Sequence, residues 1–494
     1  MMGIVKSAVL SVRNALLTAG PLVTGLVIVT WTLLTLRLLP PVNADYGMFV
    51  TVAERLRAGD RLYADVYENK DPLFHYSLAL ARSVTPFGGW FLQIAWVLVC
   101  CIAAYALMAG RGASPRAAVL VSFFATPVII TGSDFFPGSS HLPAVALLLV
   151  AIAALLDGRW LLAGFVLGAV VLFKLVFIVP LGLVLIAALW WGPRRTTLRS
   201  IPVAVVTLGG LLLLMVARGE LNPYLQTLHD NTAYANGPQG ARGLAAIVDH
   251  VQRVILVPGT LAMILVTVAL VLAVVTGHPR VLGVKPGPGS DPLFWMLVST
   301  LTGGVVVVAF TGLWPHHGEV FVVPAVLAMV IAATAFPQVF NGNSLPSVLT
   351  VAVTALLLAA VPSPSVLMTQ LEYGRSLINS QYQIPASARL IMSTGDPTSY
   401  ARIGDGLDDG HAFGLNDWTL ACPRFGQSIW EDEAILQSTL ACLPTAEVIY
   451  ITPSVKPDPN DPEWTAFLAG VDGLLASGYT CVESDAGRAC RFTR

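Results

Sequence analysis

Asp45 and Lys70 stand in two short polar segments early in the chain, 25 residues apart. The segments read Asn-Ala-Asp-Tyr-Gly over 43–47 and Glu-Asn-Lys-Asp-Pro over 68–72, and the first directly follows a long apolar run. A partly desolvated carboxylate has a raised pKa and can take a proton from a hydroxyl. A lysine at the rim of an apolar pocket can neutralise a phosphate. The pair would suit transfer of a group from a phosphate to a hydroxyl.

Both residues also have a purely structural interpretation. Residues 45–58 are typical of an amphipathic helix on a bilayer surface, because apolar residues recur at helical spacing with charged residues opposite. Asp45 could then simply cap that helix. Lys70 could extend from the bilayer edge towards water.

A histidine pair near the end of the apolar part is a second candidate for phosphate binding. His316 and His317 follow Trp314 and Pro315 at the start of a late apolar run. An imidazole there could donate to a phosphate oxygen, although aromatic and histidine residues also belong to the ordinary belt at a membrane surface.

Four further residues are candidates for acceptor or sugar binding: Tyr46, Asp134, His141 and Arg242. Asp134 lies in a short loop rich in glycine, serine and phenylalanine, where it could bind the acceptor or a divalent ion, or stabilise a turn. His141 could instead be a satisfied polar group at a helix start. Arg242 lies in the longer connection 218–253, whose spacing is not diagnostic.

The composition indicates a membrane protein. Of the 494 residues, 55% are hydrophobic and only 12% are charged, whereas soluble domains average about 25% charged. The net charge of −1 is uninformative about nucleic acid, but the basic residues do not gather into a stripe, which argues against a nucleic-acid partner. The sequence has no Walker loop, HExxH, GxSxG or glycine-rich dinucleotide turn, so a nucleotide-linked donor is not expected.

Apolar runs predict a polytopic α-helical protein with about eleven membrane-spanning helices. They lie near 21–39, 88–110, 115–132, 138–156, 160–174, 175–192, 199–217, 254–276, 293–312, 319–336 and 346–362. Basic residues fall in alternate short connections and therefore on one side of the membrane, which the positive-inside rule assigns to the cytoplasm together with the N-terminus. The odd number of spans then places the C-terminal part outside, together with loop 40–87.

Two segments need a separate interpretation. Residues 72–86 are apolar but too short for a span, so they predict an interfacial or re-entrant helix. The run 160–192 is too long for one span and contains Lys174, so it predicts two short spans that turn there. The alternative is one tilted span with Lys174 in a polar cavity.

Residues 363–494 predict a soluble extracytoplasmic α/β domain that follows the membrane domain 1–362. This part holds 16 acidic and 8 basic side chains and short strand-like runs such as 448–451. Four cysteines in a polar segment predict two disulfides in an oxidising compartment, and three pairings are open. These cysteines are Cys422, Cys442, Cys481 and Cys490.

At these residues the chain resembles the GT-C glycosyltransferases, in the branch of protein O-mannosyltransferases and lipid A aminoarabinose transferases. That branch carries an acid in the first extracytoplasmic loop and a later Lys-Pro-Pro-Leu motif. Residues 44–46 (Ala-Asp-Tyr) resemble the first and 70–73 (Lys-Asp-Pro-Leu) the second, with Asp71 in place of proline. Residues 314–324 resemble the aromatic and histidine stretch that opens a late span. The resemblance covers roughly 1–362.

The resemblance implies an inverting transferase in the cytoplasmic membrane. A polyprenyl-phosphate sugar would be the donor and a cell-envelope glycan, glycolipid or protein the acceptor. Asp45 would be the general base, and Lys70, with His316 or His317, would bind the donor phosphate. No cofactor is implied, and a divalent metal is not required. The alternatives are a transporter or flippase for a lipid-linked sugar, which should show inverted repeats, and a non-catalytic envelope scaffold.

Overall fold

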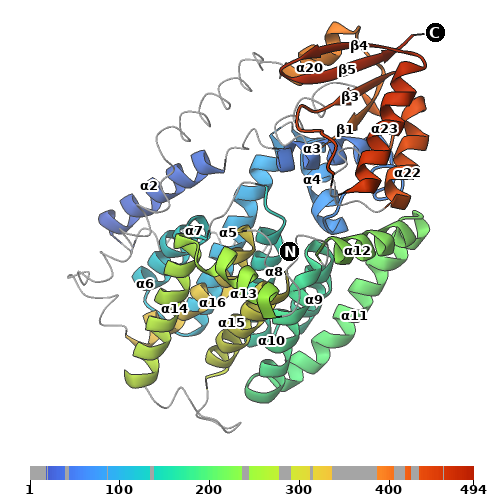
Figure 1. The fold of residues 1–494 in the computed structure, drawn as a ribbon. Helices are drawn as coiled ribbons and strands as arrows, with labels where there is room; N and C mark the ends of the chain where they lie inside the picture. Colours follow the sequence, from blue (N-terminus) through green and yellow to red (C-terminus); the bar gives the residue numbers. More distant parts are fainter. Residues whose placement is uncertain are drawn as a thin grey trace. The chain divides into compact units, whose positions relative to one another are not determined.

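The structure is a computed structural model, and its described residues form two compact units. The described residues are 18, 20–38, 44–85, 87–133, 138–235, 244–277, 291–311, 315–336, 386–404, 418–423, 433–459 and 461–493. Unit 1 comprises Met1–Leu39, Trp90–Leu211 and Ala241–Gln370. Unit 2 comprises Pro40–Gly89, Leu212–Gly240 and Leu371–Arg494. Each unit therefore joins segments that are far apart in the sequence (Figure 1).

Unit 1 is built from apolar helices. They are α2 (Pro21–Arg37), α5 (Gly88–Gly110), α6 (Pro115–Val119) with η1 (Leu120–Ala125) and α7 (Thr126–Gly132), α8 (His141–Leu156), α9 (Trp160–Phe173), η2 (Leu175–Phe177), α10 (Ile178–Trp191), α11 (Arg194–Ala217), α13 (Leu244–Ile255), α14 (Pro258–Gly277), α15 (Pro292–Thr311), η4 (Pro315–Phe321) and α16 (Val322–Ala335). The end of α11 and the first two residues of α5 belong to unit 2.

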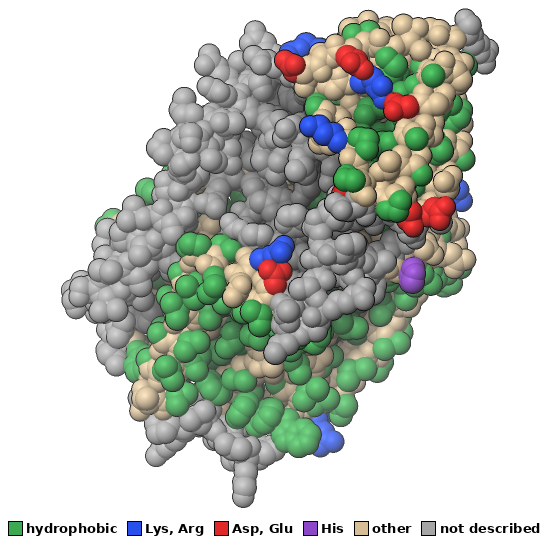
Figure 2. Space-filling model, in the orientation of Figure 1, with side chains coloured by type: hydrophobic (Ala, Val, Ile, Leu, Met, Phe, Trp, Pro, Cys, Tyr) green, Lys and Arg blue, Asp and Glu red, His purple; other side chains and the backbone are tan. Residues whose placement is uncertain are grey.

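Six of the described helices are long and apolar enough to cross a membrane, and four shorter helices are also apolar. Large apolar side chains on α11 face outwards, with Val206 73% and Leu213 68% exposed. Hydrophobic side chains also dominate the visible face of the helices in Figure 2. Such exposure is stable in lipid and costly in water. The prediction of a multi-pass membrane protein is confirmed, whereas the eleventh predicted span, 346–362, lies outside the described residues.

The predicted break at Lys174 is present. Helix α9 ends at Phe173, and Lys174 has extended backbone angles (φ −161°, ψ 103°) before η2 and α10 begin. The segment 160–192 therefore forms two helices rather than one.

Unit 2 contains three helices outside the C-terminal part: α3 (Ala44–Arg57), α4 (Pro72–Val84) and α12 (Leu221–Ala235). Helix α3 coincides with the predicted amphipathic helix, and α4 is the short helix expected over 72–86. The connection 218–253 holds α12 and the start of α13, which its sequence did not indicate.

The C-terminal part of unit 2 is a five-stranded mixed sheet in the order β2-β1-β3-β5-β4. The strands are β1 (Ser399–Ile403), β2 (Thr419–Leu420), β3 (Val448–Ile451), β4 (Tyr479–Ser484) and β5 (Gly487–Phe492), and the helices are α20 (Ala386–Ser393), α22 (Glu433–Cys442) and α23 (Pro462–Ala476). Strand β1 pairs in parallel with β2 and β3, and β5 is antiparallel to β3 and β4. The fully buried strand β3 packs its apolar residues against α22 and α23. The predicted α/β character of this part is confirmed, whereas the boundary of a separate domain at residue 363 stays a prediction.

Two disulfides link the four cysteines of this part. Cys422 is bonded to Cys442, and Cys481 to its cross-strand neighbour Cys490. The structure thus selects one of the three open pairings. A main-chain hydrogen bond of 2.7 Å from the Tyr67 nitrogen to the Pro423 carbonyl also joins loop 40–87 to the residue that follows Cys422.

Removing the first disulfide should lower thermal stability. Cys422→Ser with Cys442→Ser opens a loop with a sequence separation of 20 residues, and closing such a loop contributes about 3 kcal/mol. We expect a lower Tm in detergent for the double variant. A reductant should lower the Tm of the wild type more than that of the variant, and an equal effect on both would contradict a stabilising role for this bond.

Candidate active site

Asp45 lies in the first turn of α3, which begins at Ala44. The N-terminal end of a helix favours negative charge, so this position favours the anionic form that a general base needs. The Asp45 side chain lies outside the described residues. Whether it acts as a base therefore stays a prediction.

Tyr46, the next residue, is buried within unit 2. Its side chain is 4% exposed, and burial raises its pKa to about 12 although the nearby Arg82 opposes this. A Cβ atom at Gly89 would lie 1.9 Å from Tyr46 Oη. Only glycine at position 89 leaves room for this hydroxyl, so Tyr46 packs against the start of α5.

Lys70 lies just before α4 and is partly exposed. Its ammonium donates a hydrogen bond of 2.6 Å to Asn69 Oδ1 and lies 5.7 Å from the ring centroid of Phe49. Within the described part of the chain, no carboxylate lies within ion-pair distance of Lys70 Nζ. The ammonium thus directly contacts an amide and an aromatic face, which leaves it able to attract an anion.

Glu68 and His75 form a buried pair beside Lys70. Glu68 is 6% exposed and His75 is 0% exposed. His75 Nε2 lies 2.8 Å from Glu68 Oε2, and the same oxygen accepts a 2.6 Å hydrogen bond from the Lys70 nitrogen. Burial would raise the pKa of Glu68, but the Lys70 charge and the hydrogen bonds from His75 and Lys70 outweigh it and lower the pKa to about 2. Glu68 is therefore ionised and fixes the Lys70 backbone.

The low pKa of Glu68 predicts a loss of stability in acid. A carboxyl whose pKa falls from 4.5 to about 2 on folding stabilises the fold above pH 4.5. That contribution, at most about 3 kcal/mol, is lost as the pH falls from about 4.5 to about 2. We expect Tm to fall more between pH 6 and pH 3 in the wild type than in Glu68→Gln. Parallel curves for the two proteins would show that Glu68 does not carry this effect.

Asp71, where the resembling motif would have proline, has backbone angles that proline could adopt. It precedes α4 in an extended conformation, with φ −73° and ψ 152°. This φ is close to the value that proline requires, and an extended residue is also what Pro72 demands of its predecessor. The Asp71 carboxylate is 7% exposed, and its Oδ1 accepts a 2.7 Å hydrogen bond from Tyr224 Oη.

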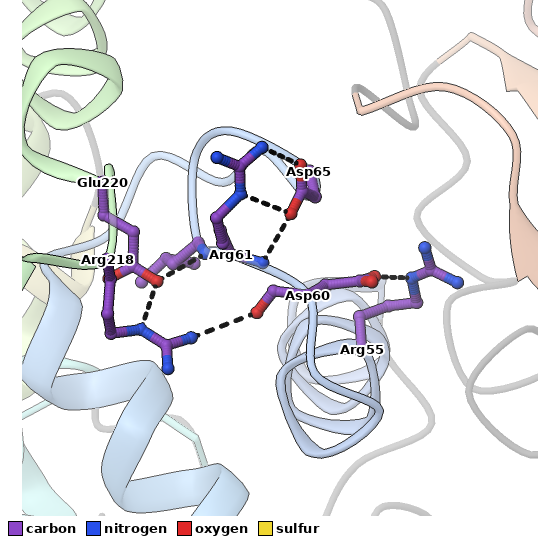
Figure 3. Close-up of polar contacts among 7 residues, drawn as sticks. Arg55, Asp60, Arg61, Asp65, Arg218 and Glu220 are labelled. Atoms are coloured by element: carbon purple, nitrogen blue, oxygen red, sulfur yellow. Dashed lines mark hydrogen bonds and ion pairs between the residues drawn. The ribbon is translucent and has the colours of Figure 1, made fainter.

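Ion pairs surround the turn between α3 and Lys70 (Figure 3). Arg55 pairs with Asp60, and Arg61 binds Asp65 through two hydrogen bonds of 2.9 and 2.8 Å. Arg218 donates a hydrogen bond of 2.8 Å to Glu220 Oε1 and one of 3.3 Å to the Asp60 carbonyl oxygen. The turn is therefore bound to the segment that begins α12.

Glu220 is at the centre of this connection and was not among the predicted site residues. It is 0% exposed, and its Oε1 accepts a 3.1 Å hydrogen bond from the Leu62 nitrogen. Its Oε2 accepts a hydrogen bond from Tyr76 Oη, and burial together with this bond raises the pKa of that tyrosine. An acid directly after the apolar run 199–217 was the only signal in the sequence.

Unit 1 brings two of the predicted histidines together. The ring centroids of His141 and His317 are 5.3 Å apart, and His141 is 2% exposed while His317 is partly exposed. Ser139 Oγ donates a hydrogen bond of 2.9 Å to the buried Glu319 and accepts one of 3.1 Å from the His141 backbone nitrogen. The cluster of Ser139, His141, His317 and Glu319 joins the start of α8 to η4. Glu319 was not among the predicted residues.

The remaining predicted residues are only partly described. His316 lies on η4, but its side chain is outside the described residues, as are Asp134 and Arg242 altogether. Across the described ranges, no group of three histidine, cysteine or acidic residues could hold a metal ion.

Two solved structures are similar to nearly the whole chain. ArnT from Cupriavidus metallidurans bound to undecaprenyl phosphate shares 15% identity with a TM-score of 0.53, over 95% of this chain and 97% of that one. The same protein in the apo state shares 16% identity with a TM-score of 0.52, again over 95% and 97% of the two chains. The chain has the GT-C fold of ArnT. This confirms the fold that the motifs predicted.

No protein-family model matches the sequence, and no curated protein sequence matches it. At 15–16% identity the structural similarity establishes the fold and not the reaction. The function is therefore a proposal, which combines this similarity with the residues of this chain.

Proposed function

We propose that this protein is a membrane glycosyltransferase that takes a sugar from a polyprenyl-phosphate donor. The observation that carries the proposal is the similarity over 95% of the chain to ArnT, a protein crystallised with undecaprenyl phosphate. Lys70 supports it, because a lysine on a rigid, partly exposed loop provides the single positive charge that a lipid phosphate needs. The apolar helices support a donor that stays in the bilayer.

The proposed reaction is a single displacement at the anomeric carbon. Asp45 takes the proton of an acceptor hydroxyl, whose oxygen attacks the anomeric carbon of the donor sugar. The bond between that carbon and the phosphate oxygen breaks, and the electron pair leaves with the polyprenyl phosphate. Lys70 stabilises the charge on the leaving phosphate. Attack from the opposite side inverts the anomeric configuration.

The histidines of unit 1 are the second part of the proposal. His317, and His316 beside it, remain candidates for hydrogen bonds to a donor phosphate. The contact between His317 and His141 and the link between Glu319 and Ser139 fix the backbone from which they extend. A hydrogen-bond donor held at a preorganised position needs no rearrangement during the reaction.

The acceptor is proposed to be a cell-envelope glycan, glycolipid or protein outside the cytoplasm. Two disulfides in the C-terminal part support an oxidising compartment for that part. Tyr46, Asp134, His141 and Arg242 remain candidates for contacts with the acceptor or the sugar.

The proposal is tested by donor consumption. Purified protein in nanodiscs is incubated with a panel of polyprenyl-phosphate sugars and an envelope extract as acceptor, and the release of polyprenyl phosphate is measured. We expect one donor to be consumed only when acceptor is present. If no donor is consumed while labelled lipid-linked sugar crosses the bilayer, the protein is a flippase and the proposal is wrong.

A further inference from the structure

We infer that Tyr224 and Asn231 of α12 are positioning residues for Lys70, an inference that rests on the proposed role of Lys70 in binding the donor phosphate. Tyr224 Oη donates a hydrogen bond of 2.7 Å to Asp71 Oδ1, and Asn231 Nδ2 donates one of 3.0 Å to the Asn69 carbonyl oxygen. The two residues therefore hold the chain on both sides of Lys70. Asn69 and Tyr224 are separated by more than 150 residues in the sequence.

The contacts from α12 come from one helical face. Tyr224 and Asn231 are seven residues apart, a spacing that places them on the same side of a helix. Thr227, which lies between them on that side, is 1% exposed. Glu220, four residues before Tyr224, binds the Leu62 nitrogen. The same face thus fixes the loop at Leu62 as well as at the Lys70 segment.

Short contacts within the loop complete the support of the Lys70 backbone. Tyr63 Oη donates a hydrogen bond of 2.7 Å to the Lys70 carbonyl oxygen, and the Lys70 backbone nitrogen donates a hydrogen bond to the Glu68 carboxylate. Tyr63 has a backbone φ of +66°, a value that residues other than glycine rarely adopt. Its ring lies 5.1 Å from that of Tyr224. This packing of α12 offsets the conformational cost of the turn at Tyr63.

The Lys70 side chain itself is held much less firmly. Its ammonium contacts the exposed Asn69 side chain and the face of Phe49. A rigid backbone combined with a lightly held ammonium is the arrangement of a group that is positioned for a ligand. We therefore expect α12 to set where the charge meets the donor phosphate.

The experiment compares binding of undecaprenyl phosphate in nanodiscs by the wild type, Tyr224→Phe, Asn231→Ala and Lys70→Met. Tyr224→Phe removes only an oxygen and with it the hydrogen bond to Asp71, so its effect on binding is indirect and smaller than the loss of a direct contact with the ligand. We expect Tyr224→Phe and Asn231→Ala each to weaken binding by about three- to tenfold. Hydrogen exchange of the peptide 67–73 should become faster in both variants.

Asp71 provides the conservative rescue. Asp71→Asn keeps an oxygen that can accept from Tyr224, so we expect near wild-type binding, whereas Asp71→Ala should resemble Tyr224→Phe. The double variant with Asp71→Ala and Tyr224→Phe should bind no more weakly than either alone. Additive losses would show that Asp71 and Tyr224 act independently and would contradict this part of the inference.

Tyr76→Phe is the matched control. It removes the same kind of hydrogen bond from a tyrosine to a buried acid, here Glu220, but does not touch residues 69–71. It should leave binding and exchange of 67–73 close to wild type. Equal losses in Tyr76→Phe and Tyr224→Phe would overturn the inference.

The outcomes separate the inference from the proposed function. Unchanged exchange over 67–73 in Tyr224→Phe and Asn231→Ala overturns the inference, whatever the binding result. Faster exchange with unchanged binding, while Lys70→Met binds weakly, also overturns it. If the wild type and Lys70→Met bind undecaprenyl phosphate equally, or neither binds it, the proposed role of Lys70 fails, and the exchange data still decide whether α12 positions the segment.

Discussion

Asp45→Asn is expected to slow sugar transfer by several orders of magnitude while leaving the protein folded and able to bind polyprenyl phosphate. Asparagine has the size of aspartate but cannot take the proton of the acceptor hydroxyl. General-base catalysis contributes roughly 10²- to 10⁴-fold to a rate. The measured quantity is kcat for label transfer from the donor, and we expect a loss of this size with little change in donor affinity.

Glu54→Gln is the control for this prediction. Glu54 lies on the same helix α3 and pairs with Arg82 and Arg57, so the change removes one carboxylate charge from the same element. Its kcat should stay within about twofold of the wild type. Equal transfer by Asp45→Asn and the wild type would remove Asp45 from the mechanism and make Asp134 the next candidate.

Lys70→Met is expected to lower kcat/KM for the donor by roughly 10²- to 10³-fold. Methionine keeps an unbranched apolar side chain and removes the charge that meets the leaving phosphate. Loss of one group that stabilises developing charge in an active site typically has an effect of this size. The loss should exceed that in Tyr224→Phe, because the second variant only displaces the charge.

Arg61→Met is the matched control for Lys70→Met. It removes a cation from the same loop, but one whose charge is already bound by Asp65. We expect less than a twofold change in kcat/KM. Comparable losses in the two variants would mean that the loop acts through its overall charge rather than through Lys70.

Local patterns in the sequence predicted the elements well. Apolar runs predicted ten helices that the structure contains, and the lone charge in a long apolar run predicted the break at Lys174. The alternation of apolar and charged residues predicted α3. Four cysteines predicted two disulfides. These features depend on neighbours along the chain, which is why the sequence was sufficient.

The contacts that support the candidate site could not be predicted in the same way. Tyr224 meets Asp71 across 153 residues, and Glu220 meets Leu62 across 158. A tyrosine and an acid at such a distance have no spacing that distinguishes a partner from a chance pair. The same holds for Glu319 and Ser139, which are 180 residues apart.

Asp71 illustrates how a departure from a motif can be understood only in three dimensions. In the sequence it weakened the match to Lys-Pro-Pro-Leu. In the structure its backbone has a φ that suits proline, and its carboxylate binds Tyr224. A tertiary hydrogen bond therefore holds the geometry that a second proline would impose through its ring.

The central claim is most directly tested with a doubly labelled donor. The donor consumed in the panel would carry ¹⁴C in the sugar and ³²P in the lipid phosphate, and both labels would be followed after incubation with wild-type protein and acceptor. We expect ¹⁴C on the acceptor and all ³²P in polyprenyl phosphate, in equal amounts. Transfer of ³²P to the acceptor together with ¹⁴C, or movement of both labels across the bilayer without separation, would contradict glycosyl transfer.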